Sequence, residues 1–316
     1  MEQATAYAPG SASNLGPGFD CLGVAFTGKG DRVSARLRPA GDGGPQVKIA
    51  FVSDPRIPKD PSYNTAAIAA LAVLRLAAQR GLAGELAIEL SIEKGLPLAG
   101  GMGGSAASAV AGAVAANALL EGSGLPQDAL MQAALEAEAV VAGRHLDNVA
   151  PSLLGGAVLV VGVDPPRVTR LQVAEAVGLV LVTPAYSVAT AKARAILPAS
   201  VSRSDAVAQA GHLGRLLLGL ERGDGELLRS CMEDRVAEPA RLALYPGFVE
   251  ARSAALAAGA YGACVSGAGP TILALAPAGE PCARVGEALA SGYRSRGIKA
   301  ELHVCEVDAQ GARVVA

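Results

Sequence analysis

The 316-residue sequence has no tryptophan, only four phenylalanines, three histidines and no long apolar run. Its formal net charge is only −2, which argues against an electrostatic footprint for nucleic acid or an anionic membrane. The most apolar stretch, residues 106–120, is short for a bilayer span and consists of small side chains, so it is typical of a packed helix. We therefore expect a globular protein with neither a nucleic-acid nor a membrane partner.

Metal-binding and secretory signals are also scarce. The five cysteines are odd in number, far apart and never in a C-x-x-C pair, which argues against a zinc cluster. They are Cys21, Cys231, Cys264, Cys282 and Cys305. The beginning of the chain, "MEQATAYAPG", has an acid at its second position and no apolar run, so it does not read as a signal peptide. These features predict a reduced, cytoplasmic protein.

Strand and helix signals alternate irregularly along the chain. The pattern predicts strands at 3–8, Cys21–Phe26, 31–39, 84–95, 155–163, Val177–Thr183, Ala260–Val265, Thr271–Ala276 and Lys299–Val307, with a turn-rich loop at Pro9–Asp20. It predicts helices at Thr65–Arg80, Ser105–Glu121, Asp128 to just before Gly143, Ser204–Arg222, Gly223–Val236, Gly247–Ala258 and Pro281–Arg296. This mixture favours two α+β domains, 1–164 and 165–316, divided at the "DPPR" turn.

One segment, "GLPLAGGMGGSAASA" from Gly95, joins a predicted strand to a predicted helix through five closely spaced glycines. Glycines let the backbone approach an anion, and the free N–H groups at a helix start point at it, so the segment suggests phosphate binding. A plain tight turn is the alternative. A Walker A loop is excluded because no lysine lies between Lys94 and Asn117. "GMGGSA" fits the loose dinucleotide fingerprint only weakly, since no second parallel strand with a terminal acid follows.

The same segment resembles the P-x-x-x-G-L-G-S-S-A-A phosphate loop of the GHMP small-molecule kinases. "GSASNLGPGFDCLGVAF" and "VSGAGPTILAL" resemble two further motifs of that family, in the same order. "GRHLDNVAPSLLGG", "TAKARAILP" and "EPARLALYPGF" are similar to the homoserine kinases within it. The resemblance implies an N-terminal phosphate-loop domain, a C-terminal ferredoxin-like domain and a homodimer. It also implies ATP-dependent, Mg²⁺-dependent phosphorylation of the side-chain hydroxyl of L-homoserine, a step of threonine synthesis.

The resemblance also assigns residues to roles. For ATP it implies Asn64, Pro97, Leu98, Ala99, Gly100, Gly101, Met102, Gly103, Gly104, Ser105, Ala106 and Ala107, and for Mg²⁺ it implies Ser105 and Glu138. For the amino-acid substrate it implies Asn14, Asp20, His145, Asn148, Thr190, Arg194 and Arg241, with Asp20 and Asn148 nearest the reaction. It implies that the glycine motif Ser266, Gly267, Ala268 and Gly269 supports the phosphate loop.

The residues themselves agree with several of these roles and leave others open. Glu138 lies at the edge of an apolar helical stripe, where a carboxylate is as well suited to solvent as to a metal. Asn64 would also serve as a helix cap. Arg194 and Arg241 can each hold a carboxylate through the guanidinium fork, although exposed arginines commonly serve solubility.

The sequence departs from the family at Gly104, where the loop usually has a serine; we expect a weakened phosphate contact at most. Asn148 stands near the place where other branches of the superfamily have an aspartate base, and an amide cannot take a proton at neutral pH. Catalysis would then rest on alignment and electrostatics, with the hydroxyl proton passing to the phosphate or through Asp20. Three alternatives stay open: a kinase for another small alcohol, a non-catalytic ligand-binding descendant, and a dinucleotide-dependent oxidoreductase.

Overall fold

The computed structural model describes residues 1–39, 46–82, 86–120, 122 and 124–315. Its strands are β1 (Gln3–Asn14), β2 (Gly18–Arg38), β3 (Gln46–Val52), β4 (Ala87–Glu93), β5 (Ala157–Val163), β6 (Pro166–Leu171), β7 (Val177–Pro184), β8 (Gly262–Val265), β9 (Ile272–Pro277), β10 (Ala300–Cys305) and β11 (Arg313–Val315). Its α-helices are α1 (Thr65–Gln79), α2 (Gly104–Ala118), α3 (Gln127–Val141), α4 (Val149–Leu154), α5 (Thr190–Ala195), α6 (Arg203–Arg222), α7 (Gly225–Arg229), α8 (Glu238–Arg241), α9 (Phe248–Ala257) and α10 (Glu280–Ser295). Short 3₁₀ turns, η1 and η2, lie at Pro61–Tyr63 and Leu242–Leu244.

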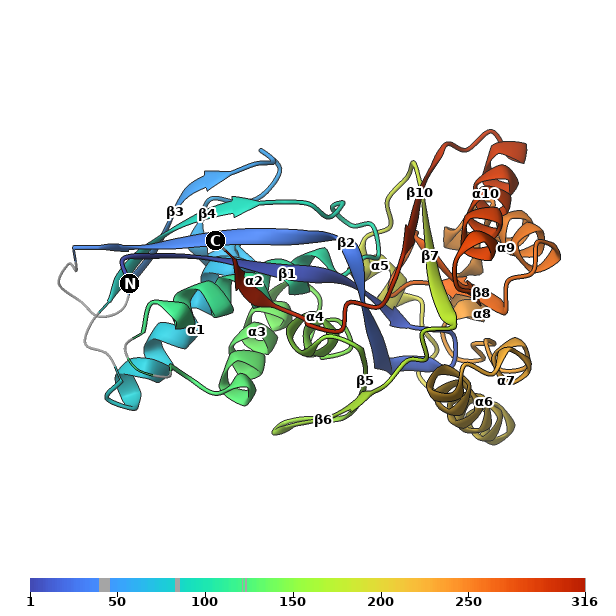
Figure 1. The fold of residues 1–316 in the computed structure, drawn as a ribbon, viewed down its shortest axis with the longest axis horizontal. Helices are drawn as coiled ribbons and strands as arrows, with labels where there is room; N and C mark the ends of the chain where they lie inside the picture. The colour runs from blue at the N-terminus through green and yellow to red at the C-terminus, as the bar shows by residue number, and fades with distance from the viewer. Residues whose placement is uncertain (40–45, 83–85, 121, 123, 316) are drawn as a thin grey trace.

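The first sheet has the order β11-β1-β2-β4-β3, and β5 extends it by pairing with β2 and β6. Helices α1 to α4 cover one of its faces (Figure 1). The alanine-rich α2 lies between this sheet and α1, and a Cβ at Gly112 would come within 2.4 Å of the Ala66 carbonyl oxygen. Small side chains are therefore needed because α1 and α2 approach each other closely.

The second sheet has the order β10-β7-β9-β8. It lies between the core shared with the first sheet and a second apolar cluster formed with α9 and α10. In β7, Leu179 and Leu181 face the core shared with the first sheet, whereas Val180 and Val182 face the cluster formed with α9 and α10. Both faces of β7 are therefore buried, which explains its unbroken apolar run. Together the two sheets and their helices give the predicted α+β, two-domain architecture (Figure 1).

The predicted loop at Pro9–Asp20 is wrong except at residues 15–17, because β1 continues to Asn14 and β2 begins at Gly18. The small residues there serve close packing: a Cβ at Gly10 would lie 2.4 Å from the Phe26 ring. The two strands predicted on either side of Gly28 are likewise one strand, β2. β1 pairs with β2 on both sides of Gly28, with a register shift between Pro9 and Gly10. This pairing outweighs the local preference of glycine for a turn.

The predicted helix Gly223–Val236 ends early, since α7 covers only Gly225–Arg229. The carboxylate of Asp234 accepts hydrogen bonds from the backbone N–H groups of Val236, Ala237 and Glu238, at 2.7, 3.0 and 2.9 Å. An acidic side chain that accepts from several backbone donors in this way favours a local turn over a continued helix.

The cap predicted for α3 also differs. Pro126 caps that helix and Asp128 lies in its first turn, whereas the predicted stop before Gly143 is confirmed. The predicted strand 84–95 begins at Ala87 among the described residues, and Glu85 and Glu121 lie outside them.

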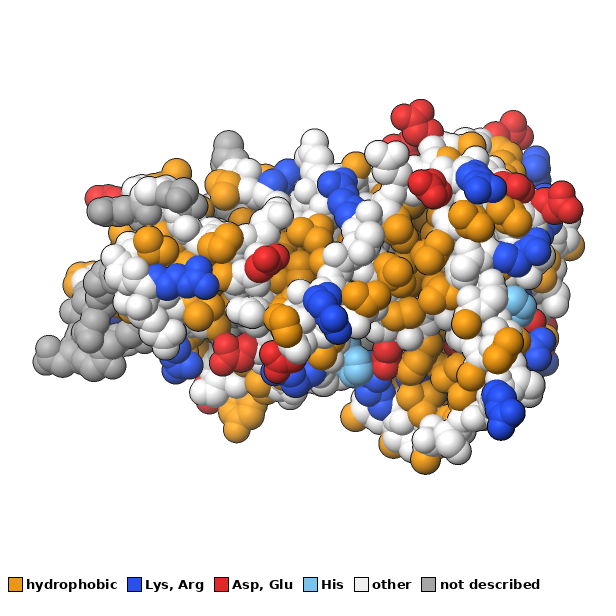
Figure 2. All heavy atoms as spheres, turned by 90° about the horizontal axis from the view of Figure 1, so that it is seen from below, with side chains coloured by type: hydrophobic (Ala, Val, Ile, Leu, Met, Phe, Trp, Pro, Cys, Tyr) orange, Lys and Arg blue, Asp and Glu red, His pale blue; other side chains and the backbone are white. Residues whose placement is uncertain are grey.

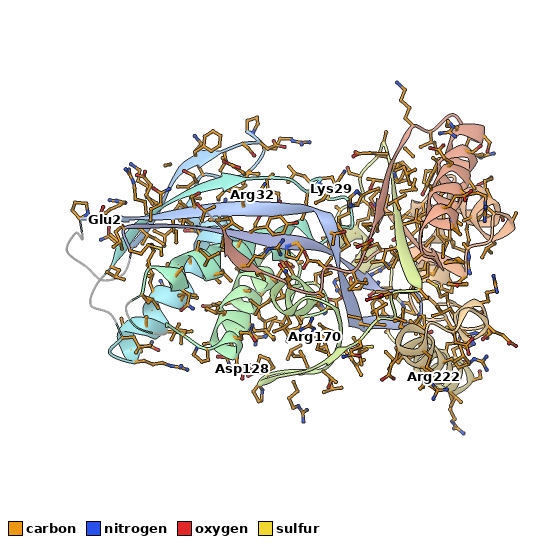
Figure 3. The ribbon with its side chains drawn as sticks, viewed as in Figure 1. Glu2, Lys29, Arg32, Asp128, Arg170 and Arg222 are labelled. Carbon is orange, nitrogen blue, oxygen red and sulfur yellow. The ribbon has the colours of Figure 1, made fainter. Side chains whose placement is uncertain are left out.

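The division at residues 1–164 and 165–316 stays a prediction, but sheet membership does not follow it. Asp164 and Pro165 form the turn of the β5–β6 hairpin in the first sheet, and β11 returns to pair with β1. Lys29 of β2, labelled near the junction of the sheets in Figure 3, forms an ion pair with Glu301 of β10.

Charges of both signs are interspersed over the described residues of the face drawn in Figure 2. Within the described part of the chain, no helix has the length and apolar character needed to cross a membrane.

Candidate active site

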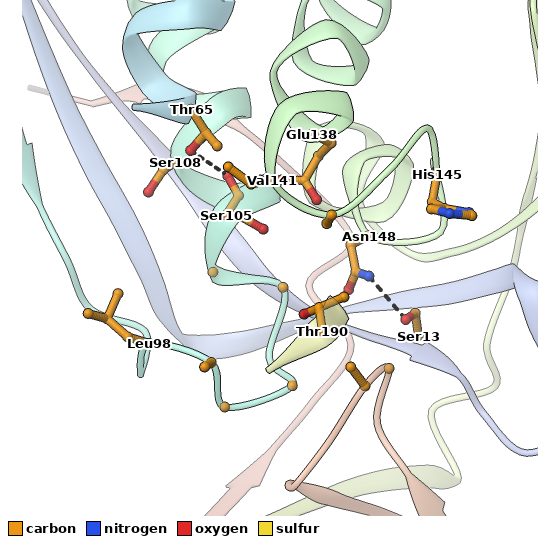
Figure 4. Close-up of a pocket in the computed structure, with 18 of the residues that line it drawn as sticks. Ser13, Thr65, Leu98, Ser105, Ser108, Glu138, Val141, His145, Asn148 and Thr190 are labelled. Carbon is orange, nitrogen blue, oxygen red and sulfur yellow. Dashed lines mark hydrogen bonds between the residues drawn. The ribbon is translucent and has the colours of Figure 1, made fainter. Parts of the chain in front are cut away.

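A cavity of ~370 Å³ is lined by residues of the first sheet, of the glycine-rich turn, of helices α3, α5 and α8, and of the turn between β8 and β9 (Figure 4). The structure brings most of the residues expected at the site to its wall. These are Asn14, Asp20, Asn64, Pro97 to Gly101, Gly103 to Ser105, Glu138, His145, Asn148, Thr190, Arg194, Arg241 and Gly267 to Gly269. The remaining four, Met102, Ala106, Ala107 and Ser266, are buried behind that wall. Nucleotide, metal and substrate candidates therefore share one cavity.

In the glycine-rich turn, the carbonyl groups of residues 100–104 all accept hydrogen bonds from other residues of the protein. Gly100 O accepts from the N–H and hydroxyl of Thr271 at 3.2 and 2.5 Å, and Gly101 O from the hydroxyl of Ser266 at 2.6 Å. Met102 O accepts from the N–H of Ser11 at 3.2 Å, Gly103 O from the N–H of Ala107 at 2.9 Å, and Gly104 O from Lys94 Nζ at 2.7 Å. Five consecutive carbonyls thus point into the protein.

The N–H groups of the same turn, in contrast, have no acceptors in the described part of the chain. Within the described chain, none of the N–H groups of residues 100–106 donates a hydrogen bond to another residue, and the start of α2 has no side-chain cap. Gly101 and Gly103 have φ angles of 77° and 67°, and a Cβ on Gly101 would lie 2.6 Å from the Ser266 carbonyl oxygen. A row of free donors at a helix N-terminus is suited to bind phosphate oxygens.

Glu138 lies opposite this turn on α3, near Ser105 (Figure 4). Its side chain is buried, and its Oε1 atom has no hydrogen-bond partner among the described residues. Burial raises the pKa of this carboxyl to about 7, although a hydrogen bond from Ser105 lowers it. One carboxylate, one hydroxyl and phosphate oxygens form a donor set that fits Mg²⁺, which takes few protein ligands. An unsatisfied oxygen in this position agrees with such a site.

At the other end of the cavity, Arg194 and Asp20 form a bidentate ion pair. Arg194 Nη1 and Nη2 lie 3.0 and 2.9 Å from the two Asp20 oxygens, and His145 Nδ1 lies 3.6 Å from Asp20 Oδ2. The Nε atom of Arg194 is buried and has no partner among the described residues. A ligand carboxylate would compete with Asp20 for the Nη1 and Nη2 donors of this guanidinium.

Arg241 is held more firmly than Arg194. Its side chain is buried, its Nε donates to Ala193 O at 2.8 Å, and its Nη1 donates to Gly267 O at 3.2 Å. The guanidinium also lies over the ring of Phe19, 5.3 Å from its centre. These contacts fix the guanidinium, and Arg241 lines the cavity with donors besides Nε to offer a ligand.

Asn64 is engaged in the fold. Its Oδ1 accepts from the N–H of Ala67 at 3.2 Å, which caps α1, and its Nδ2 donates to Pro58 O at 2.9 Å. Its amide therefore has one N–H left for a nucleobase, and this contact stays a prediction. Ile57, Pro58 and Tyr63 line the cavity beside it.

The sequence analysis missed a buried charged cluster behind the phosphate loop. Lys94 forms an ion pair with Asp31 of β2, and its Nζ also donates to Ser108 Oγ at 3.0 Å. Asp31 further accepts from Ser108 Oγ at 2.6 Å and from the N–H of Gly95 at 3.1 Å. With the bond to Gly104 O, all three Lys94 donors are used, so this lysine joins β2, the loop and α2.

Replacing Lys94 with methionine should therefore destabilise the protein, because Asp31 is fully buried and would lose its counter-ion. The expected loss is about 3–5 kcal/mol in the free energy of unfolding. Combining Lys94→Met with Asp31→Asn removes both charges and should recover much of that loss. Urea unfolding of the three proteins, with the exposed Lys48→Met as control, measures this; equal stability of Lys94→Met and wild type would contradict it.

A second prediction concerns Gly104, where a serine side chain fits. A Cβ there would have its nearest contacts at 3.4 Å, and the residue does not have a positive φ. Gly104→Ser should fold normally and bind ATP up to about tenfold more tightly, the size of one modest hydrogen bond. Gly103→Ser is the matched control: its Cβ would lie 2.2 Å from Ser11 Oγ, so activity should be lost. Titration with ATP compares them, and weaker binding by Gly104→Ser would contradict the prediction.

Comparison with known proteins agrees with this geometry. Residues 64–156 match the GHMP kinases N terminal domain, and residues 216–295 match the GHMP kinases C terminal domain. The chain is 37% identical to a homoserine kinase of Chlorobium phaeobacteroides, covering 100% of both chains, and 39% identical to one of Xanthomonas campestris, covering 100% of this chain and 95% of that one. The crystal structure of homoserine kinase from Cytophaga hutchinsonii superposes with a TM-score of 0.91 at 38% identity, over 100% of this chain and 98% of that one. The chain therefore belongs to the homoserine kinase family of the GHMP kinases.

Proposed function

We propose that the protein transfers the γ-phosphoryl group of ATP to the side-chain hydroxyl of L-homoserine, giving O-phospho-L-homoserine and ADP. The observation that carries this proposal is a row of N–H groups at residues 100–106 that have no acceptor among the described residues, beside the cavity that Glu138 and two arginines line. Phosphoryl transfer asks a protein mainly for alignment and charge neutralisation, and these groups supply both. The product is an intermediate suited to threonine synthesis, as the family resemblance implies.

Each part of the cavity has a role in this reaction. The loop N–H groups hold the phosphates, and Ser105 and Glu138 would hold Mg²⁺, which neutralises phosphate charge when bound. Arg194 and Arg241 receive the α-carboxylate of the amino acid, with Asn14, His145 and Thr190 around it. Asp20, paired with Arg194, lies where it can orient the polar groups of the substrate.

Among the alternatives, the family membership favours a kinase over an oxidoreductase. A sugar or a simple alcohol brings no carboxylate for the arginines, and the ion pair of Asp20 with Arg194 suits a zwitterion, which can bind to both partners. A non-catalytic descendant would have lost a metal or phosphate ligand, whereas Ser105 and Glu138 are both at the cavity wall.

The test is ADP release by purified protein with Mg-ATP and one candidate acceptor at a time: homoserine, serine, threonine or mevalonate. We expect rapid turnover with homoserine alone. Turnover with mevalonate would favour a different kinase, and ATP binding without any turnover would favour the ligand-binding descendant.

A homodimer and a cytoplasmic location complete the proposal. The five cysteines are free, as expected in a reducing compartment, and they support the location. The dimer rests on the family resemblance and is tested by the mass of the protein in solution.

A further inference from the structure

Ser11 on β1 connects the phosphate loop to the cavity residue Asn148. The serine is fully buried, and its backbone N–H donates to Met102 O at 3.2 Å. Its hydroxyl donates to Asn148 Oδ1 at 3.0 Å and lies 3.3 Å from the Asn148 carbonyl oxygen. The loop packs directly on this hydroxyl, because a Cβ on Gly103 would lie 2.2 Å from it. One residue thus contacts both the loop and the amide.

The contacts of Ser11 decide which way the Asn148 amide faces. Its Oδ1 is occupied by Ser11, and one N–H of its Nδ2 is donated to Ser13 Oγ at 3.0 Å, the bond dashed near the centre of Figure 4. The second N–H of Nδ2 has no partner among the described residues, and Asn148 lines the cavity. The free N–H makes this amide a possible hydrogen-bond donor to a group in the cavity.

A second contact set anchors Ser13. Its backbone carbonyl accepts from the N–H of Gly267 at 3.0 Å, so the glycine motif of the second sheet reaches it. Burial raises the pKa of Asp147, and a side-chain hydrogen bond with Ser13 partly offsets that rise. The amide of Asn148 is therefore held between two serines of one strand, spaced to lie on the same face of β1.

We propose that Ser11 is a positioning residue. Its hydroxyl turns the Asn148 amide so that the amide N–H faces the acceptor hydroxyl, and its backbone N–H keeps that amide at a fixed place relative to the phosphate loop. The inference rests on the proposed kinase function and concerns the alignment of its two substrates. A donor at this point orients the hydroxyl oxygen toward the phosphorus without removing its proton. Misplacement of a reacting group by about 1 Å can cost about 10²-fold in rate.

Loss of the Ser11 hydroxyl should therefore affect turnover and spare binding. In Ser11→Ala, kcat should fall about 10- to 100-fold while the KM values for ATP and homoserine stay within about threefold. In an Asn148→Ala background the same change should cost less than about threefold, because Ser11 acts through Asn148. Ser152→Ala is the matched control: its buried hydroxyl donates to Pro9 O at 2.8 Å and does not contact the amide. It should keep kcat within about threefold.

Several outcomes would overturn the inference. If the fall in kcat of the double variant equals the product of the falls in Ser11→Ala and Asn148→Ala, Ser11 does not act through the amide. An unchanged kcat in Ser11→Ala, with wild type active on homoserine, would refute it while leaving the kinase function intact. If Ser11→Ala fails to fold, Ser13→Ala removes the other anchor and should show the same split between kcat and KM. Wild type without turnover on homoserine would instead overturn the proposed function.

Discussion

Glu138→Gln should lower kcat by about 10²-fold or more, because a metal that neutralises phosphate charge contributes several kcal/mol to the transition state. The amide has nearly the shape of the carboxylate, so the buried site should keep its packing. It cannot bind Mg²⁺ with the same strength, since it lacks the negative charge. Steady-state rates over a Mg²⁺ titration measure the loss, and the expected result includes a higher Mg²⁺ requirement.

The raised pKa of Glu138 adds a pH dependence to this prediction. Burial raises that pKa from 4.5 to about 7, so below pH 7 the carboxyl is protonated and a proton competes with Mg²⁺. Apparent Mg²⁺ affinity should therefore fall as the pH drops below about 7, and it should be flat over the same range in Glu138→Gln. In metal-free protein, the stability of the fold changes with pH in the opposite direction. The folded state holds the proton more tightly than the unfolded chain, so stability falls as the pH rises from about 4.5 to about 7.

The control for Glu138 is Glu136→Gln, an exposed position on the same helix. It should leave kcat and the Mg²⁺ requirement unchanged. Equal Mg²⁺ dependence in Glu138→Gln and wild type would contradict a metal-binding role, whatever the effect on kcat.

Arg194→Met should reduce kcat/KM for homoserine by about 10²- to 10³-fold, the size expected for losing two charge-assisted hydrogen bonds to the substrate carboxylate. Two losses contribute: the substrate carboxylate loses its fork, and Asp20 loses its partner. The KM for ATP should stay within about threefold, because Arg194 lies at the amino-acid end of the cavity. Initial rates with each substrate varied in turn separate these effects.

Lys192→Met is the matched control for Arg194, since it removes an exposed positive charge from the same short helix. It should behave as wild type. A variant Arg194→Met with an unchanged KM for homoserine would refute the carboxylate-binding role. Adding Asp20→Asn to Arg194→Met distinguishes the two losses: stability lost with the ion pair should recover, whereas homoserine binding should not.

The strand, turn and helix around the phosphate loop could be predicted because each carries a local signal. β4 alternates, the turn is rich in glycine, and α2 has no helix breaker except Gly112. The segment Pro9–Asn14 could not be assigned in this way. Its small residues resemble a turn, yet they lie in β1 because Phe26 and α2 pack closely against them.

The candidate site shows the same limit. Its residue types could be assigned from the family motifs, but the ion pair of Asp20 with Arg194 joins residues 174 positions apart and has no signal in either segment. Lys94 and Asp31 are 63 positions apart and meet only because β2 and β4 pair with Arg32 opposite Glu93. Contacts of this kind depend on strand register, which short motifs do not specify.

The donors that hold the loop carbonyls of Gly100 and Gly101 come from Thr271 and Ser266, and the last strand, β11, pairs with the first. During synthesis the chain emerges from its N-terminus, so the phosphate loop leaves the ribosome long before these donors do. Until they arrive, its carbonyls are free to turn outward and repel an anion. We therefore expect nucleotide binding to depend on residues made long after the loop, so a chain that stops before Ser266 should bind ATP more weakly than one that includes Thr271.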